Sequence, residues 1–96
     1  MIRSFRNQGT EDLFNGLDSK AARKVCPQNL VKVARRKLDV VNAAARLEDL
    51  KSPGYMLEKL GRERAGQHAI RINDRFRVCF IWSDSDAEQV EVTDYH

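Results

Sequence analysis

The sequence has few cysteines, few prolines and no long apolar run. Its 96 residues include two cysteines and two prolines, and Cys26 and Cys79 lie too far apart to form a CxxC motif. We therefore expect reduced thiols in a cytoplasmic protein, not a disulfide framework. No apolar run approaches the roughly 18 residues that a membrane-spanning helix needs. Residues 1–6 also lack the apolar stretch of a secretory signal. The sequence thus predicts neither a membrane protein nor a secreted one.

The motifs that hold nucleotides, metals or an activated serine are also missing. There is no P-loop, no GxGxxG before a predicted helix and no GxSxG. His68 and His96 are far from each other and from both cysteines, so no zinc-ligand spacing is present. We therefore expect no metal and no cofactor.

Positive charge is present in excess and is unevenly distributed. The formal net charge is +3. Residues 20–37 carry seven cations and no acid, residues 51–77 carry seven cations against three acids, and residues 78–96 carry five acids and no Lys or Arg. Such asymmetry in a small domain indicates a polyanionic partner such as nucleic acid, although a basic patch can also dock an acidic protein. The alternative interpretation is a solubilising surface.

The periodicity of apolar residues predicts one α+β domain over residues 1–96. Val31, Ala34, Leu38 and Val41 recur at helical spacing, and alternating residues such as Ile70 and Ile72 indicate strands. The predicted order is β-α-α-β-β-β-β, because short links favour antiparallel neighbours. Two N-terminal helices would cover one face of the sheet and leave the other partly open. The expected elements are strands at 2–5, 55–60, 67–73, 76–82 and 88–95, a short helix at 10–16 and a long helix at 27–48.

The partly open face would carry the polar residues that could perform chemistry. Glu58 lies on the first strand of the C-terminal set, and Arg71 and Arg77 lie on the next two strands, opposite Ile70 and Val78. A carboxylate, two guanidiniums and the closing Asp94-Tyr95-His96 are sufficient parts for RNA cleavage without a metal. Each also has a plainer interpretation: an exposed carboxylate, a cation pair balanced by Glu91, a packing tyrosine and a frayed terminal residue.

At this point the chain resembles the HigB branch of the RelE superfamily, the killer toxins of bacterial type II toxin–antitoxin modules. The resemblance covers essentially the whole sequence. It is carried in order by the opening Met-Ile-Arg-Ser-Phe, by Ala-Arg-Arg-Lys-Leu at 34–38, by Ala-Ala-Arg-Leu-Glu-Asp-Leu at 44–50, by Leu-Glu-Lys-Leu at 57–60, by the segments 64–68, 70–74 and 76–80, and by the closing Asp-Tyr-His.

The resemblance implies a RelE-like fold, with two helices on one face of a small twisted, mainly antiparallel sheet. It also implies an endoribonuclease that cuts mRNA in the 30S A site of the 70S ribosome and is neutralised by a HigA-type helix-turn-helix antitoxin, which alone would contact operator DNA. By position, Arg71 and Arg77 match the family's phosphate-binding arginines, and the closing triplet matches its active-site residues. Glu58 departs from HigB toxins that carry histidine there. Either Glu58 or His96 would then be the base.

The predicted RNA- and ribosome-binding residues are basic. Those on the long helix follow from charge as much as from the resemblance, and the others lie beside the first strand of the C-terminal set. They are Lys32, Arg35, Arg36, Lys59, Arg62 and Arg64.

Two other function classes remain beside the enzyme. A non-catalytic ribosome- or RNA-binding module would need only the basic residues. A DNA-binding partner is disfavoured, because no recognition helix with a preceding turn is evident.

Overall fold

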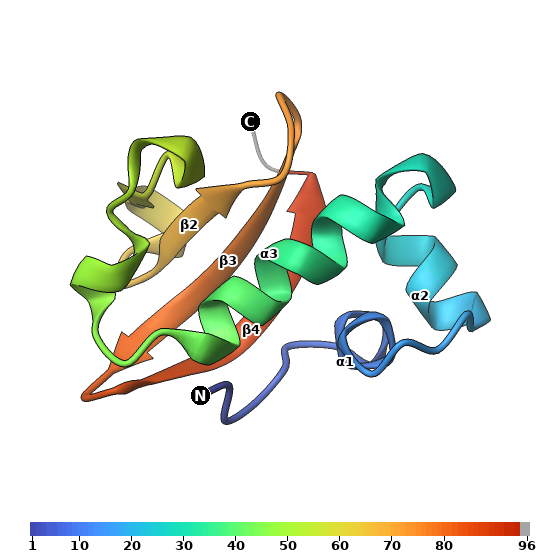
Figure 1. Ribbon diagram of the computed structural model, residues 1–96, viewed down its shortest axis with the longest axis horizontal. Helices are drawn as coiled ribbons and strands as arrows, with labels where there is room; N and C mark the ends of the chain where they lie inside the picture. The colour runs from blue at the N-terminus through green and yellow to red at the C-terminus, as the bar shows by residue number, and fades with distance from the viewer. Residues whose placement is uncertain (95–96) are drawn as a thin grey trace.

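The computed structural model describes residues 1–94 and has the predicted α+β architecture (Figure 1). Three α-helices, α1 (Gln8–Phe14), α2 (Lys20–Val25) and α3 (Val31–Ala43), precede the strands. The strands are β1 (Glu58–Lys59), β2 (His68–Arg71), β3 (Phe76–Ser83) and β4 (Asp86–Asp94). They form one sheet in the order β1-β2-β3-β4, and each is antiparallel to the next. Short 3-10 turns are η1 (Gln28–Leu30), η2 (Leu47–Leu50), η3 (Pro53–Tyr55) and η4 (Arg62–Arg64).

Helix α2 forms where the sequence predicts a connection or a weak helical turn. The Ser19 hydroxyl caps it by accepting a hydrogen bond from the Ala22 N–H at 3.0 Å. Helices α1 and α2 pack closely together, since a Cβ added at Gly9 would lie 2.4 Å from the Ala21 carbonyl oxygen. A six-residue helix has little stability of its own, so packing against α1 maintains it. The signal missed in the sequence is the cap.

Helix α3 ends at Ala43, earlier than the predicted end at residue 48. The Asp49 carboxylate accepts hydrogen bonds from the backbone N–H groups of Ala45 at 2.9 Å and Arg46 at 3.0 Å. Such local bonds give the chain an alternative to continuing the helix. The chain then turns through η2 and η3, which carries it toward the partly open side of the sheet.

The N-terminal segment does not form the predicted strand at residues 2–5. It makes two isolated parallel bridges to β4, between Ile2 and Ala87 and between Phe5 and Val90. The pairing is interrupted because β4 is irregular between them, with Gln89 at a φ of +50°. The Thr10 hydroxyl then accepts from the Val92 N–H at 3.1 Å. This segment and α1 therefore cover the edge of β4, which would otherwise offer unpaired backbone groups.

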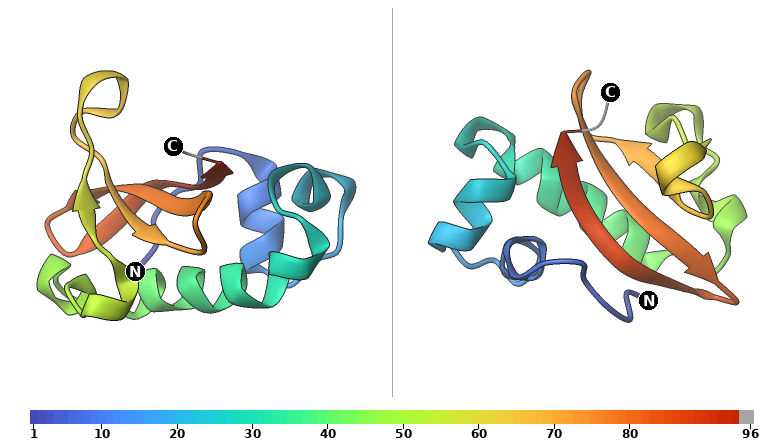
Figure 2. Two further views of the ribbon diagram at one scale, coloured as in Figure 1. Left: turned by 90° about the horizontal axis from the view of Figure 1, so that it is seen from above. Right: turned by 180° about the vertical axis from the view of Figure 1, so that it is seen from behind.

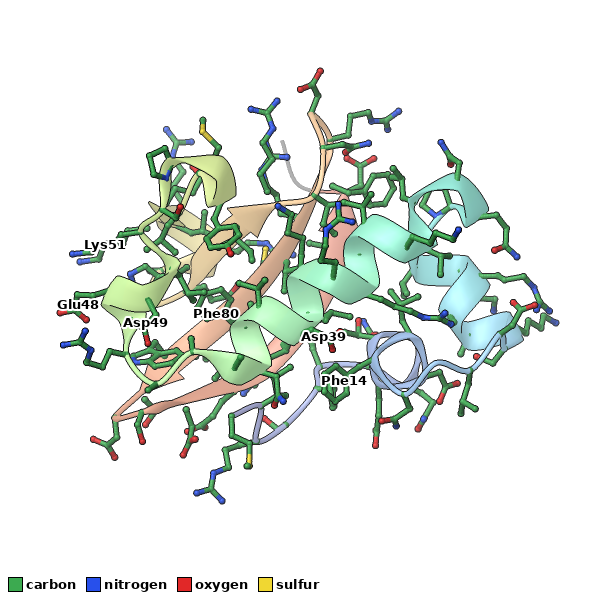
Figure 3. All side chains as sticks on the ribbon, viewed as in Figure 1. Phe14, Asp39, Glu48, Asp49, Lys51 and Phe80 are labelled. Carbon is green, nitrogen blue, oxygen red and sulfur yellow. The ribbon has the colours of Figure 1, made fainter. Side chains whose placement is uncertain are left out.

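The main core lies between α3 and the sheet. On α3, the side chains of Ala34, Leu38 and Val41 are fully buried. They belong to one apolar cluster with residues of β2 and β3 that include Ile70 and Phe80, and Figure 3 shows Phe80 on β3, beside the C-terminal end of α3. Fully burying each large aliphatic or aromatic side chain contributes about 1.5–3 kcal/mol. The helical face of the sheet is therefore the part that holds the fold together.

The opposite face of the sheet is only partly covered. Leu60, Ala69 and Cys79 form a second, small apolar cluster there. Beside it, Arg64 donates to the Gln67 side-chain oxygen at 3.0 Å and to Glu91 at 3.1 Å. Figure 2 shows this face from behind, with the loop from η4 to β2 beside the sheet. The covered region ends short of the β2–β3 turn, and the candidate site lies at that end.

Candidate active site

Strand register places two arginines side by side on the partly open face. Arg71 on β2 is directly opposite Arg77 on β3, while Ile70 and Val78 form the next pair and point into the core. Alternation along each strand therefore separates the charged face from the apolar one. Glu58 on β1 is opposite Ala69, the residue two before Arg71. The sequence prediction that these three side chains share a face is confirmed by this register.

The three side chains also line one cavity of about 730 Å³. One wall comes from β1, β2 and β3, and the other from the segment that follows η2. Figure 3 shows Lys51, which belongs to that segment, extending from the chain beyond the C-terminal end of α3. A volume of this size falls in the range of small-ligand sites. The lining residues are Lys51, Ser52, Pro53, Met56, Leu57, Glu58, Arg71 and Arg77.

Arg77 is the more deeply placed of the two arginines. Its side chain is 16% exposed, and its Nε lies 3.8 Å from Glu58 Oε1. One terminal nitrogen donates to the carbonyls of Phe76, at 3.1 Å, and Asn73. Glu58 is half exposed, so its carboxylate can be reached from solvent while it lies beside a guanidinium. The pair joins β1 to β3 across the site.

Asn73 connects the two arginines. Its backbone carbonyl accepts from Arg71 Nε at 3.2 Å and also from Arg77. Its side-chain oxygen accepts from the backbone N–H groups of Arg75 at 2.9 Å and Phe76 at 2.7 Å, which closes the turn between β2 and β3. One residue therefore shapes the turn and receives a hydrogen bond from each guanidinium.

The electrostatic arrangement favours an anion. Like charges directly opposite on two strands destabilise a sheet. Here the Arg71–Arg77 pair is partly offset by Glu58 and by Asp74, which forms an ion pair with Arg71. Both guanidiniums also border the cavity with Lys51. A phosphate between the arginines would remove the remaining repulsion and accept charge-assisted hydrogen bonds.

Neither thiol is poised as a nucleophile. Burial raises the pKa of Cys79 to about 11, which keeps the thiol protonated near neutral pH. Burial also raises the pKa of Cys26. His68 faces Phe80 with the rings stacked, away from the cavity, and burial followed by the charge of Lys59 lowers its pKa. Among residues 1–94, no group of three His, Cys, Asp or Glu side chains could hold a metal ion.

The closing triplet is only partly within the described residues. Asp94 pairs with Phe76 across β3 and β4, and its carboxylate lies 2.5 Å from the Arg75 guanidinium. It is not among the residues that line the cavity. Tyr95 and His96, the two other predicted active-site residues of the triplet, lie outside the described residues.

The predicted RNA-binding residues fall into two groups. Arg35 donates from Nε to the Leu13 carbonyl at 3.1 Å, and Arg64 binds Glu91, so both stabilise the fold directly. The other four side chains belong to exposed residues on α3, β1 and η4. They are Lys32, Arg36, Lys59 and Arg62.

Sequence reasoning missed part of the cavity wall. Met56 lies in the strand predicted at 55–60 and Pro53 just before it, yet Pro53–Tyr55 forms η3 and β1 is only two residues long. Their apolar character has no periodicity that would single them out. Asn73 ends the strand predicted at 67–73, but the convergence of both arginines on its carbonyl depends on the strand register.

No helix formed by residues 1–94 has the length and apolar character of a membrane-spanning helix.

Comparisons with known proteins agree with this architecture. Solved structures of YoeB from Staphylococcus aureus superpose with TM-scores of 0.60, for a YoeB–YefM complex, and 0.59, for a YoeB dimer. The sequence identities are 14% and 18%, and the alignments cover 100% and 99% of this chain and 98% and 97% of those chains. At these identities the likeness shows the fold alone.

Sequence comparisons identify the family. The chain is 27% identical to Endoribonuclease HigB of Proteus vulgaris over 96 residues, which is 100% of each chain. It is 31% identical to Toxin HigB-1 of Vibrio cholerae over 88 residues, which is 91% of this chain and 90% of the relative. The family model described as the RelE-like toxin HigB of type II toxin–antitoxin systems matches residues 3–96. The chain therefore belongs to the HigB-like toxins.

Proposed function

We propose that this toxin is a ribosome-dependent endoribonuclease that cuts mRNA and thereby inhibits translation and growth. The observation that carries the proposal is the cavity in which Glu58, Arg71 and Arg77 meet. A full-length relative in Proteus vulgaris bears the name Endoribonuclease HigB. A carboxylate beside two guanidiniums can accept a proton while the guanidiniums stabilise negative charge, and cleavage of a phosphodiester needs both.

The proposed reaction uses the nucleophile that RNA itself supplies. Glu58 or His96 accepts the proton of the 2′-hydroxyl, and the 2′-oxygen attacks the adjacent phosphorus. Arg71 and Arg77 hold the non-bridging oxygens as their charge grows. The bond from phosphorus to the 5′-oxygen breaks; His96 protonates that oxygen when Glu58 is the base, and a solvent water protonates it when His96 is the base. The products are a 2′,3′-cyclic phosphate and a 5′-hydroxyl, and no metal is required for any of these steps.

The remaining predicted residues receive supporting roles. Tyr95 orients a base. Asp94, which binds Arg75 at the end of β4, belongs to the same active-site triplet. The exposed basic residues contact ribosomal RNA; they are Lys32, Arg36, Lys59 and Arg62. The acid and base residues alone are weak catalysts. The 30S A site therefore holds the mRNA in the orientation that cleavage needs. The site of action is then cytoplasmic.

The proposal also includes an antitoxin partner. The matching family model describes the toxin of a type II toxin–antitoxin system. One structural neighbour was solved as a complex of YoeB with YefM. We propose that a HigA-type antitoxin with a helix-turn-helix domain neutralises this chain. Operator DNA would then be bound only through the antitoxin.

The test is cleavage of a labelled mRNA with and without programmed 70S ribosomes, with the 5′ ends mapped by primer extension. We expect cuts at A-site codons only when ribosomes are present, and mass spectrometry of the new 3′ ends should find a cyclic phosphate. A single 2′-deoxy nucleotide at the cut site should block the reaction. Products ending in a 3′-hydroxyl would contradict the proposed chemistry.

Two variants assign the base. Glu58→Gln and His96→Gln each remove one proton acceptor at similar side-chain size. Glu58→Gln should lose most of the cleavage rate if Glu58 is the base and little of it if His96 is the base. His96→Gln should slow cleavage in either case, because His96 is then the acid or the base, while binding to ribosomes is unchanged. Ribosome binding with intact mRNA in the wild type would instead favour the second candidate, a non-catalytic inhibitor that acts through the exposed basic residues.

A further inference from the structure

The cavity has a second wall whose chemistry the cleavage mechanism does not use. Pro53, Met56 and Leu57 line the cavity together with Arg71 and Arg77. Met56 is 56% exposed, one of three large apolar residues of the described chain that are more than half exposed. The exposed Met56 side chain and the neighbouring Pro53 thus give the charged cavity an apolar part that an apolar group of a ligand can contact.

The backbone at Met56 adopts a conformation that methionine rarely takes. Its φ and ψ are 52° and 46°, in the left-handed region that residues with a Cβ rarely adopt. The turn holds it there, because the Met56 N–H donates to the Pro53 carbonyl at 3.2 Å. Tyr55 anchors the turn to α3, since Lys37 Nζ lies 5.0 Å from the centre of its ring. The fold thus fixes Met56 at the cavity.

The two walls together select one kind of occupant. Lys51, Arg71 and Arg77 against Glu58 make the cavity cationic, so the ligand carries negative charge. The apolar wall favours a planar, apolar group on the same ligand. A nucleotide has both, a phosphate and an aromatic base, and a thioether makes favourable contacts with aromatic rings.

We propose that Met56 and Pro53 form a nucleobase subsite, which holds the base of one nucleotide beside the scissile phosphate while Arg71 and Arg77 hold the phosphate. This inference rests on the proposed function, because the apolar wall of the same cavity would bind a base of the RNA that the enzyme cuts. Since larger rings bury more area against Met56, the subsite prefers a purine to a pyrimidine.

The direct test uses the methyl groups of the methionines. The chain has two, Met1 and Met56, so methyl-labelled protein gives one reporter and one internal control. Titration with an uncleavable 2′-deoxy dinucleotide of adenine should shift the Met56 methyl resonance through the ring current and leave Met1 unchanged. Inorganic phosphate should not produce the ring-current shift. An unmoved Met56 resonance at saturating dinucleotide would overturn the subsite.

A kinetic test separates base binding from chemistry. On ribosomes programmed with each of the four bases beside the cut, Met56→Ala should raise KM about tenfold, the effect of losing roughly 1.4 kcal/mol of binding, with kcat little changed. The purine preference should be lost. Met56→Leu keeps an apolar side chain of similar size and should behave like the wild type. A loss of kcat at unchanged KM would contradict the proposal.

The two tests distinguish failure of the subsite from failure of the enzyme. If no RNA is cut but the Met56 resonance still shifts with the dinucleotide, the proposed function is wrong and the nucleotide site stands. If RNA is cut while the resonance does not move and Met56→Ala cleaves all four substrates like the wild type, the function stands and the subsite is wrong. Equal melting temperatures of Met56→Ala and Met56→Leu should show that neither result arises from unfolding.

Discussion

The two faces of strands β2 and β3 differ, since one packs in the core and the other forms the candidate active site. The face toward α3 carries Ile70 and Val78, which are fully buried. The other face carries Arg71 and Arg77, which border a cavity and repel one another. Neighbouring residues along one strand therefore belong to environments that differ in charge, hydration and purpose. A sequence selected only for stability would not place two guanidiniums directly opposite each other.

The contrast shows how the fold supplies rigidity to the site. The helical face anchors the strands through apolar packing, so the arginines need contribute nothing to the core. The turn at Asn73 and the ion pair with Glu58 then fix their positions. Substitutions on the two faces should accordingly separate, with activity lost from one and stability lost from the other.

The largest effect should come from the charged face. Arg77→Ala should lower the cleavage rate by about 100- to 1000-fold, because it removes a donor aimed at developing charge. Arg77→Lys keeps the charge and should recover only part of the rate. Single-turnover cleavage on programmed ribosomes measures both. Arg23→Ala, which removes an exposed charge on α2, is the control, and an equal loss there would point to net charge instead.

A smaller loss of activity should follow from the turn. Asn73→Ala removes the side-chain oxygen that closes the turn, so the carbonyl no longer holds both guanidiniums in place. We expect kcat to fall about tenfold, in keeping with roughly 1–3 kcal/mol for an unmade hydrogen bond. Asn73→Asp keeps the acceptor and should rescue most of it. If both variants cleave like the wild type, the turn has no positioning role.

On the helical side, a change should alter stability alone. Gly9→Ala places a methyl group 2.4 Å from the Ala21 carbonyl, and such overpacking costs about 1–3 kcal/mol. Urea unfolding measures the loss, with Gly61→Ala as control because its Cβ would meet no atom within 4 Å. Cleavage per folded molecule should be unchanged. Reduced cleavage at full folding would break the separation between the faces.

The smallest effect concerns the pH dependence of stability. Hydrogen bonds from Ser19 and then Gln8 lower the pKa of Asp12 below its ordinary 3.8. The carboxylate therefore stabilises the fold above that value, and the contribution is lost as pH falls through the folded-state pKa. Asp12→Asn should unfold at a lower urea concentration than the wild type at pH 7, and the difference should shrink below about pH 4. A difference independent of pH would exclude a role for the charge.

The sequence alone predicts the α+β class and the shared face of Glu58, Arg71 and Arg77. Strand alternation is a local property, so the residues from 67 to 82 can be assigned to faces without knowledge of the fold. The η3 turn is not local in this sense, because Lys37 on α3 contacts the Tyr55 ring. The end of α3 is set locally by hydrogen bonds to Asp49, but the apolar periodicity that predicts the helix does not register them.

Only one of the two walls of the cavity can be predicted from the sequence. Its cationic wall is predictable because it lies on paired strands. Its apolar wall is not, since Pro53 and Met56 reach the site through a turn whose left-handed residue is a methionine and not a glycine. The sequence also does not show which basic residues are bound within the fold. Arg35 binds the Leu13 carbonyl and Arg64 binds Glu91, although both resemble the other basic residues in sequence.

The most direct test of the central claim is a double-mutant cycle on the two arginines. If Arg71 and Arg77 hold one phosphate together, single-turnover cleavage by Arg71→Ala/Arg77→Ala should be little slower than by either single variant, because the first substitution already breaks the unit. Circular dichroism should show that all three variants remain folded. Losses that simply multiply, or a double variant that still cleaves like the wild type, would contradict the account.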